Sequence, residues 1–152
     1  MKKHLAYMIA TCGGLGCSPV APGTIGSIGS WLVLYFLQYI VVPPLLLWGI
    51  GGVSIFSGWW ATQQVCDSPD TKDPSWIVID EWVAVWFLLL CMPAVLWWQA
   101  LAVMLFRVFD IVKPWPVSAT EQLPGAAGIF ADDITAAIIT GAIMAAVLLA
   151  VG

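Results

Sequence analysis

The chain has 152 residues, of which 61% are hydrophobic and only 9% charged, and its mean hydropathy is +0.96. Soluble domains carry about a quarter charged residues, so the composition indicates an integral membrane protein, with residues 1–152 forming one domain. The net charge of −4 and the scattered basic residues argue against a nucleic-acid partner. A substrate in the membrane or at its surface fits better.

Four apolar stretches approach the roughly 20 residues that a helix needs to cross a bilayer. They cover residues 25–42, 44–65, 82–106 and 134–151. None shows the alternation of a barrel strand, so the predicted fold class is all-α. Thr24, after Pro22-Gly23, is expected to cap the first helix, and Pro43-Pro44 to turn the chain into the second.

The third stretch carries Pro93 near its middle and Trp97-Trp98 just after it. It is either one kinked span or two short helices in a hairpin, and the proline and the interfacial tryptophans favour the hairpin. The chain would then have about four to five membrane-embedded helices. The hairpin also puts all 14 charged residues on one side, which the positive-inside rule places in the cytoplasm.

Histidine and cysteine chemistry fit this sequence poorly. The sole histidine, His4, lies beside the N-terminus, and no cysteine has an arginine six positions later. The four cysteines lack CxxC spacing and are interpreted as small packing residues, namely Cys12, Cys17, Cys66 and Cys91. If the protein is a hydrolase, carboxylates and a metal must do the work.

Arg107, Asp110 and Lys113 are spaced three apart before Pro114, so on a helix they lie along one face. Spacing alone leaves two interpretations about equal: a functional group, or charged side chains that anchor a helix end at the membrane surface.

Asp80-Glu81 and Asp132-Asp133 are each expected to open a helix, where carboxylates commonly act as structural caps. If Asp110 joins them, five carboxylates gather at one membrane face and repel one another unless cations neutralise them. Mg²⁺ would neutralise them and leave room for phosphate oxygens. The Gly/Pro-rich segment 13–27 could hold an anion on its backbone amides, although an ordinary turn is the more probable interpretation of its glycines.

Taken together, four segments resemble the characteristic blocks of the phosphatidylglycerophosphatase A family, in the right order. They are SPVAPGTIGS at 18–27, IVIDE at 77–81, FRVFDIVKPWP at 106–116 and GIFADD at 128–133. The resemblance covers nearly the whole chain, and the FRxFDxxKPWP block is specific. It implies an enzyme of the bacterial inner membrane that removes the terminal phosphate of phosphatidylglycerophosphate with Mg²⁺, its active site facing the cytoplasm.

Within that resemblance, the hypothesis for the mechanism is attack by a metal-activated water. Its residue roles fall into three groups. Asp80, Asp132 and Asp133 are the candidate metal ligands, Glu81 or Asp110 would orient or deprotonate the water, and Arg107, Lys113, Thr24 and Ser27 would bind the phosphate. Two alternatives remain: a small ion or proton transporter that uses the carboxylates, and a structural membrane subunit with capped helices.

Overall fold

The computed structural model describes residues 2–66 and 74–151. Within these ranges the protein is all-helical, as predicted. The elements are α1 (Lys2–Ala10), the 3-10 helix η1 (Leu15–Cys17), α2 (Pro22–Tyr39), α3 (Pro44–Val65), α4 (Ile79–Leu90), α5 (Leu96–Val112), α6 (Val117–Thr120) and α7 (Ala126–Val151). Residues 67–73, which the sequence analysis assigns to the charged side, lie outside the described residues.

The predicted hairpin is confirmed, and the single kinked span is wrong. α4 ends at Leu90 and α5 begins at Leu96, with Pro93 in the turn between them. The proline has no N–H to continue α4, and its carbonyl accepts a hydrogen bond of 2.7 Å from Val95 N. α3 has the bounds that the sequence predicts.

Two helix starts differ from the prediction. α2 begins at Pro22 with Ala21 as N-cap and no side-chain capping bond, so Thr24 lies inside the first turn and is not the cap. α7 begins at Ala126, directly after Gly125 with φ +59°. Asp132 and Asp133 therefore lie more than one turn inside α7, and their interpretation as a helix cap is wrong.

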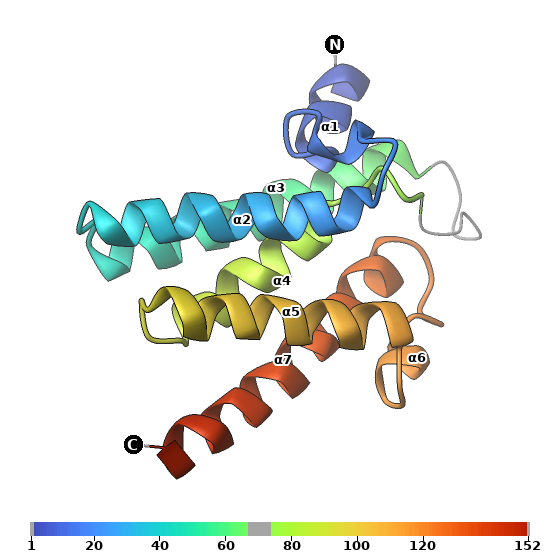
Figure 1. Ribbon diagram of the computed structural model, residues 1–152. Helices are drawn as coiled ribbons and strands as arrows, with labels where there is room; N and C mark the ends of the chain where they lie inside the picture. The colour runs from blue at the N-terminus through green and yellow to red at the C-terminus, as the bar shows by residue number, and fades with distance from the viewer. Residues whose placement is uncertain (1, 67–73, 152) are drawn as a thin grey trace.

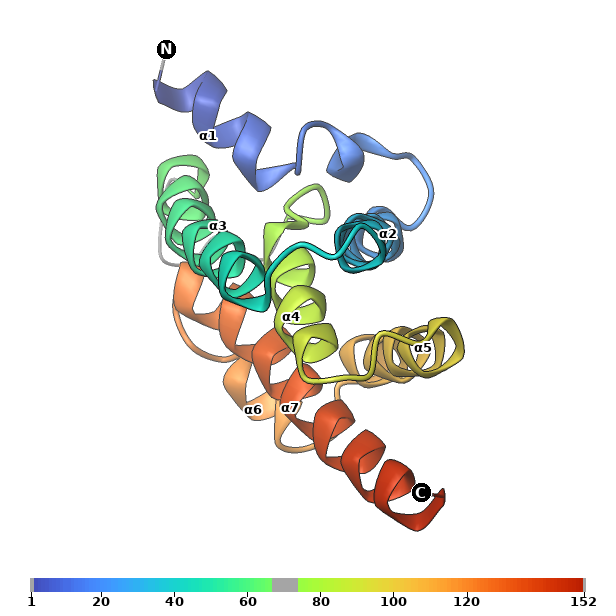
Figure 2. The ribbon, with the colours of Figure 1, turned by 90° about the vertical axis from the view of Figure 1, so that its left-hand side faces the viewer.

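Helix α4 lies at the centre of the molecule, with α2, α3, α5 and α7 around it (Figure 2). Eight of its 12 residues are buried, because its apolar side chains face several neighbours at once. Trp86 is the largest of them, and its Nε1 donates a hydrogen bond of 3.0 Å to Leu47 O on α3. α2 and α5 run alongside each other, and α7 crosses behind α5 (Figure 1). The ends of several helices thereby meet near the start of α4.

Two helices of the described chain, α3 and α7, are long and apolar enough to cross a membrane. Only 28% and 22% of their most apolar windows are buried inside the protein, unlike the core helix of a soluble domain. Large apolar side chains such as Phe56 and Leu149 are at least 80% exposed. These features support membrane association. They do not establish four to five embedded helices, since α4 and α5 have only 12 and 17 residues.

Candidate active site

Three helices bring the predicted charged residues together. Asp80 and Glu81 occupy the first turn of α4, Arg107 and Asp110 the last two turns of α5, and Asp132 and Asp133 the second turn of α7. Each of these helices packs against the other two. The segment before α4 is fixed by a hydrogen bond of 3.0 Å from Val78 N to Ala10 O at the end of α1. The described fold thus converts three separate sequence clusters into one site.

Arg107 links α5 to α4. Its Nη1 lies 2.5 Å from Asp110 Oδ2 on its own helix and 3.3 Å from Glu81 Oε1. The guanidinium is mostly buried, and its Nε has no hydrogen-bond partner among the described residues. Arginine has five N–H donors in a planar fork, so donors remain for an anion beside Glu81 and Asp110.

Lys113 links α5 to α7. It follows the last turn of α5 in the left-handed conformation, with φ 46° and ψ 54°. That turn directs Nζ to Asp132 Oδ2 at 2.6 Å and to Glu121 Oε1 at 3.0 Å. Burial alone would lower the pKa of Lys113, but the hydrogen bonds and charges of Asp132 and Glu121 outweigh it and raise the pKa. Lys113 is therefore a permanent cation in this site.

Asp133 is common to two sets of three carboxylates. One set adds Asp80 and Glu81, and the other adds Asp110 and Asp132. In each set, one oxygen from every residue lies within 4.8 Å of the others. Asp133 is 3% exposed and its Oδ2 has no hydrogen-bond partner in the described structure. A buried carboxylate oxygen without a donor is costly, and a bound cation would remove that cost.

The N-terminus of α2 closes one side of the site. A Cβ atom on Gly23 would collide with Glu81 Oε1 and lie 3.2 Å from Arg107 Nη1. Thr24 is the next residue, partly exposed. Ser27 is fully buried, and its hydroxyl donates a hydrogen bond of 2.9 Å to Gly23 O. In this conformation the hydroxyl proton of Ser27 is used in a hydrogen bond to the backbone. Thr24 instead follows Gly23, the residue that packs against Glu81.

Sequence reasoning missed three residues at or near the site. Glu121 follows α6 and binds Lys113, and no spacing in the sequence indicated that contact. Gly23 could have been suspected from its sequence block, because a glycine inside a helix often marks a place where another part of the protein lies against the helix backbone. Cys12 lies near Asp80 and Glu81; burial and then these two carboxylates raise its pKa to about 12. By contrast, Cys17 and Cys91 are exposed, so interpreting them as packing residues is wrong.

The family model described as phosphatidylglycerophosphatase A matches residues 8–148, a range that includes every charged residue of the site. The chain belongs to the phosphatidylglycerophosphatase A family. The resemblance of the four sequence blocks is thereby confirmed. Membership makes the protein a phosphoric monoester hydrolase, so the transporter and structural alternatives are not supported.

Curated relatives of this phosphatidylglycerophosphatase A family member come from three bacteria. Proteins named "Phosphatidylglycerophosphatase A" from Escherichia coli and Haemophilus influenzae are 31% and 34% identical to it. These matches span 91% and 87% of this chain and 80% and 82% of the relatives. A Bacteroides thetaiotaomicron protein named "Putative phosphatidylinositol-3-phosphatase" is 38% identical over 90% of this chain and 89% of its own length. No solved structure gives a significant match.

The carboxylates of this family member fit a divalent cation. Mg²⁺ and other hard cations take oxygen ligands, and two three-carboxylate sets are available around Asp133. Among the described residues, five carboxylates stand against the two cations Arg107 and Lys113, if Glu121 at the exposed edge is set aside. The excess negative charge and the unpartnered Asp133 Oδ2 are the structural observations that match a bound cation.

Proposed function

We propose that this protein is a Mg²⁺-dependent lipid phosphatase that hydrolyses phosphatidylglycerophosphate to phosphatidylglycerol and inorganic phosphate, as a step of phospholipid biosynthesis. One domain over residues 1–152, embedded in the bacterial inner membrane with its site toward the cytoplasm, would carry the reaction. The observation that supports the proposal best is the convergence of Arg107, Lys113 and five carboxylates in a member of this family.

The residue roles follow from charge and contact. Asp80, Asp132 and Asp133 would hold Mg²⁺. Asp133 lies in both carboxylate sets, whereas Asp80 lies only in the set with Glu81 and Asp132 only in the set with Asp110. When bound, Mg²⁺ neutralises the carboxylates, attracts phosphate oxygens and lowers the pKa of water. Without a cation, the excess negative charge would repel the phosphomonoester dianion.

Arg107 and Lys113 would bind the non-bridging phosphate oxygens. Each already contacts two carboxylates, which holds the cation in place before the substrate arrives. Within the described part of the chain, Arg107 Nε has no partner and Lys113 Nζ has three N–H donors for two contacts, so both side chains retain a donor. Thr24 and the backbone amides at the start of α2 would complete the phosphate site; Ser27 could join only after releasing Gly23 O.

Glu81 or Asp110 would orient and deprotonate the attacking water. Both accept from Arg107 Nη1, which fixes their carboxylates in the site, and each belongs to a different carboxylate set. The base would take a proton from the water as the water oxygen attacks phosphorus. The bond from phosphorus to the glycerol oxygen would break in line with this attack, and the glycerol oxygen would take a proton from solvent to give the hydroxyl of phosphatidylglycerol. A covalent aspartyl-phosphate is an alternative that Asp80, Asp132 or Asp133 could form.

Phosphate release from purified protein in detergent tests the proposal. Phosphatidylglycerophosphate, phosphatidic acid and phosphatidylinositol 3-phosphate would be compared with Mg²⁺ and with a chelator. The last lipid is included because of the name of the Bacteroides relative. We expect Mg²⁺-dependent release, selective for phosphatidylglycerophosphate, that the Asp133→Asn variant lacks. Preferential hydrolysis of phosphatidylinositol 3-phosphate would overturn the substrate, and release unaffected by chelator would overturn the metal.

A further inference from the structure

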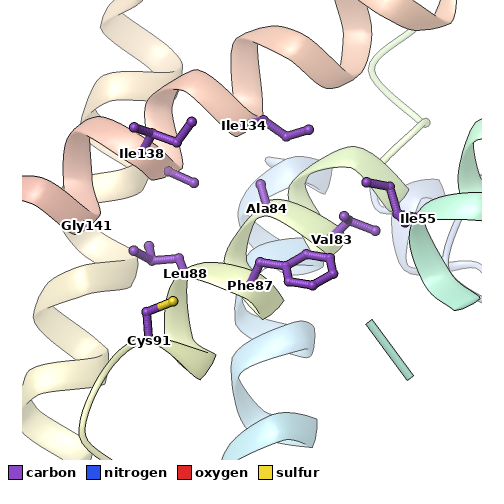
Figure 3. Close-up of a pocket in the computed structure, with 10 residues that line it drawn as sticks. Ile55, Val83, Ala84, Phe87, Leu88, Cys91, Ile134, Ile138 and Gly141 are labelled. Atoms are coloured by element: carbon purple, nitrogen blue, oxygen red, sulfur yellow. The ribbon is translucent and has the colours of Figure 1, made fainter. Parts of the chain in front are cut away.

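A cavity of about 340 Å³ lies between α3, α4 and α7, and the described residues that line it are all apolar apart from one cysteine (Figure 3). Ala84 and Leu88 of α4 face Ile134 and Ile138 of α7 across it. Its volume is in the range of ligand sites in proteins. None of the described residues that line it is charged, so the cavity differs in chemistry from the active site described above.

The cavity begins where the active site ends. On α4, Asp80 is followed by Val83 and Ala84 one helical turn later, and the same face continues to Cys91. On α7, Asp133 is adjacent to Ile134 and one turn before Ala137. At 1.5 Å per residue, the apolar path along α4 from residue 83 to 91 is about 12 Å long. Carboxylates thus stand at one end of a continuous apolar path.

Packing ties the two regions together. Ile79 and Val83 of α4 and Phe130 of α7 belong to one buried cluster, against which Ile55 and Ile134 of the cavity wall pack. Ile79 precedes Asp80, and Phe130 lies two residues before Asp132. A molecule that fills the cavity would therefore rest on the same side chains that position the active-site carboxylates.

We propose that this cavity binds an acyl chain of the phospholipid substrate while the phosphate lies at the carboxylate end. The inference rests on the proposed function, which gives the substrate a charged head and apolar tails. The structure places a region for each part side by side. The carboxylates of α4 and α7 lie at one end, and the apolar lining of the cavity follows them along the same two helices. The substrate would enter sideways from the membrane between α4 and α7.

Crosslinking of a lipid tests the cavity without relying on turnover. Full-length protein in phosphatidylcholine nanodiscs would receive phosphatidylglycerophosphate with a diazirine in its acyl chain, and adducts would be mapped by mass spectrometry. We expect adducts on the cavity walls of α4 and α7 that excess unlabelled phosphatidylglycerophosphate removes. Adducts spread over exposed apolar residues such as Phe56 and Leu149, without competition, would overturn the proposal.

A matched pair of variants provides the kinetic test. A Cβ on Gly141 would make only an ordinary 3.5 Å contact with Leu88, so Gly141→Phe can place its ring in the cavity. A Cβ on Gly49 of α3 would meet nothing within 4 Å among the described residues, so Gly49→Phe serves as control. We expect Gly141→Phe to raise KM for a dioleoyl substrate by roughly ten- to fiftyfold, because the added ring would keep about two to three methylenes of the acyl chain out of the cavity. KM for a dihexanoyl substrate should stay unchanged.

The two hypotheses fail in different ways. If both variants hydrolyse phosphatidylglycerophosphate and KM depends on acyl-chain length equally in Gly141→Phe and Gly49→Phe, the acyl-chain site is overturned. The proposed function would still stand. Absence of hydrolysis by the folded native protein would overturn the proposed function, whereas the crosslinking result would still decide whether a lipid chain occupies the cavity.

Discussion

Gly23 at the start of α2 packs directly against the Glu81 carboxylate at the start of α4, so closely that any side chain at position 23 would collide with Glu81 Oε1. Glu81 is itself held by Arg107. The glycine thus lets a helix N-terminus approach a buried ion pair of the active site. This contact explains why a glycine stands in the first turn of α2.

Replacing Gly23 by alanine should separate activity from stability. The added methyl group displaces the Glu81 carboxylate and with it Arg107, and displacements near 1 Å in an active site lower kcat/KM by roughly 10- to 100-fold. Stability should change little, because the preference of a helix for alanine over glycine, about 1 kcal/mol, offsets the cost of displacing the Glu81 carboxylate. Phosphate release and thermal unfolding would be measured beside Gly49→Ala, whose methyl group meets nothing. Full activity in Gly23→Ala would refute this role.

The convergence of the site was predictable because the hairpin follows from local signals. Pro93 breaks the third apolar stretch, and the break returns Arg107 to the side of Asp80. The start of α7 was not predictable in the same way. Acidic pairs commonly open helices, yet Asp132 lies inside α7 because Gly125 supplies a left-handed turn and Ala126 and Ala127 directly after it are good helix formers.

Contacts that depend on the path of a loop could not be read from the sequence. Glu121 meets Lys113 only because Lys113 takes a left-handed conformation and the chain then turns back through α6. The Gly23 contact likewise depends on how α2 packs against the start of α4. Charge type and helical spacing therefore identified the active-site residues, whereas their partners depended on tertiary packing.

Lys113→Met should destabilise the protein, because it leaves Asp132 buried without its cation. Losing a charged hydrogen-bond partner costs about 1 to 3 kcal/mol, or roughly 2 to 10 °C in Tm for a chain of this size. Thermal unfolding would be compared with Glu121→Gln, which keeps the contact between Lys113 and Asp132. A Tm of Lys113→Met equal to that of the native protein would contradict the structural importance of this ion pair.

The same variant yields a pH test. The pKa of Lys113 is raised in the folded protein, so its contribution to stability is complete below the unfolded pKa of about 10.4 and declines only as pH rises through the higher folded pKa. We therefore expect the Tm difference between native protein and Lys113→Met to be constant from pH 7 to 9. A difference that shrinks by half across this interval would show that Lys113 loses its proton there.

Cys12 should resist alkylation, in contrast to Cys17. Burial, together with the charges of Asp80 and Glu81, raises the pKa of the Cys12 thiol to about 12, so almost no reactive thiolate exists at pH 7.5. Maleimide labelling followed by mass spectrometry should modify the exposed Cys17 in minutes and Cys12 only after denaturation. Equal labelling of both cysteines in folded protein would contradict the buried position of Cys12 beside the carboxylates.

Asp133→Asn provides the sharpest test of the metal site. Asp133 belongs to both carboxylate sets, so the neutral amide should weaken Mg²⁺ binding most, while less repulsion keeps the metal-free protein at least as stable as the native one. A ligand at 100 times its Kd stabilises a protein by about 2.7 kcal/mol, so saturating Mg²⁺ should raise the native Tm by several degrees. We expect no such rise in Asp133→Asn and a normal rise in Glu121→Gln. A Mg²⁺-induced rise of native size in Asp133→Asn would remove Asp133 from the ligand set, whatever the effect of the substitution on activity.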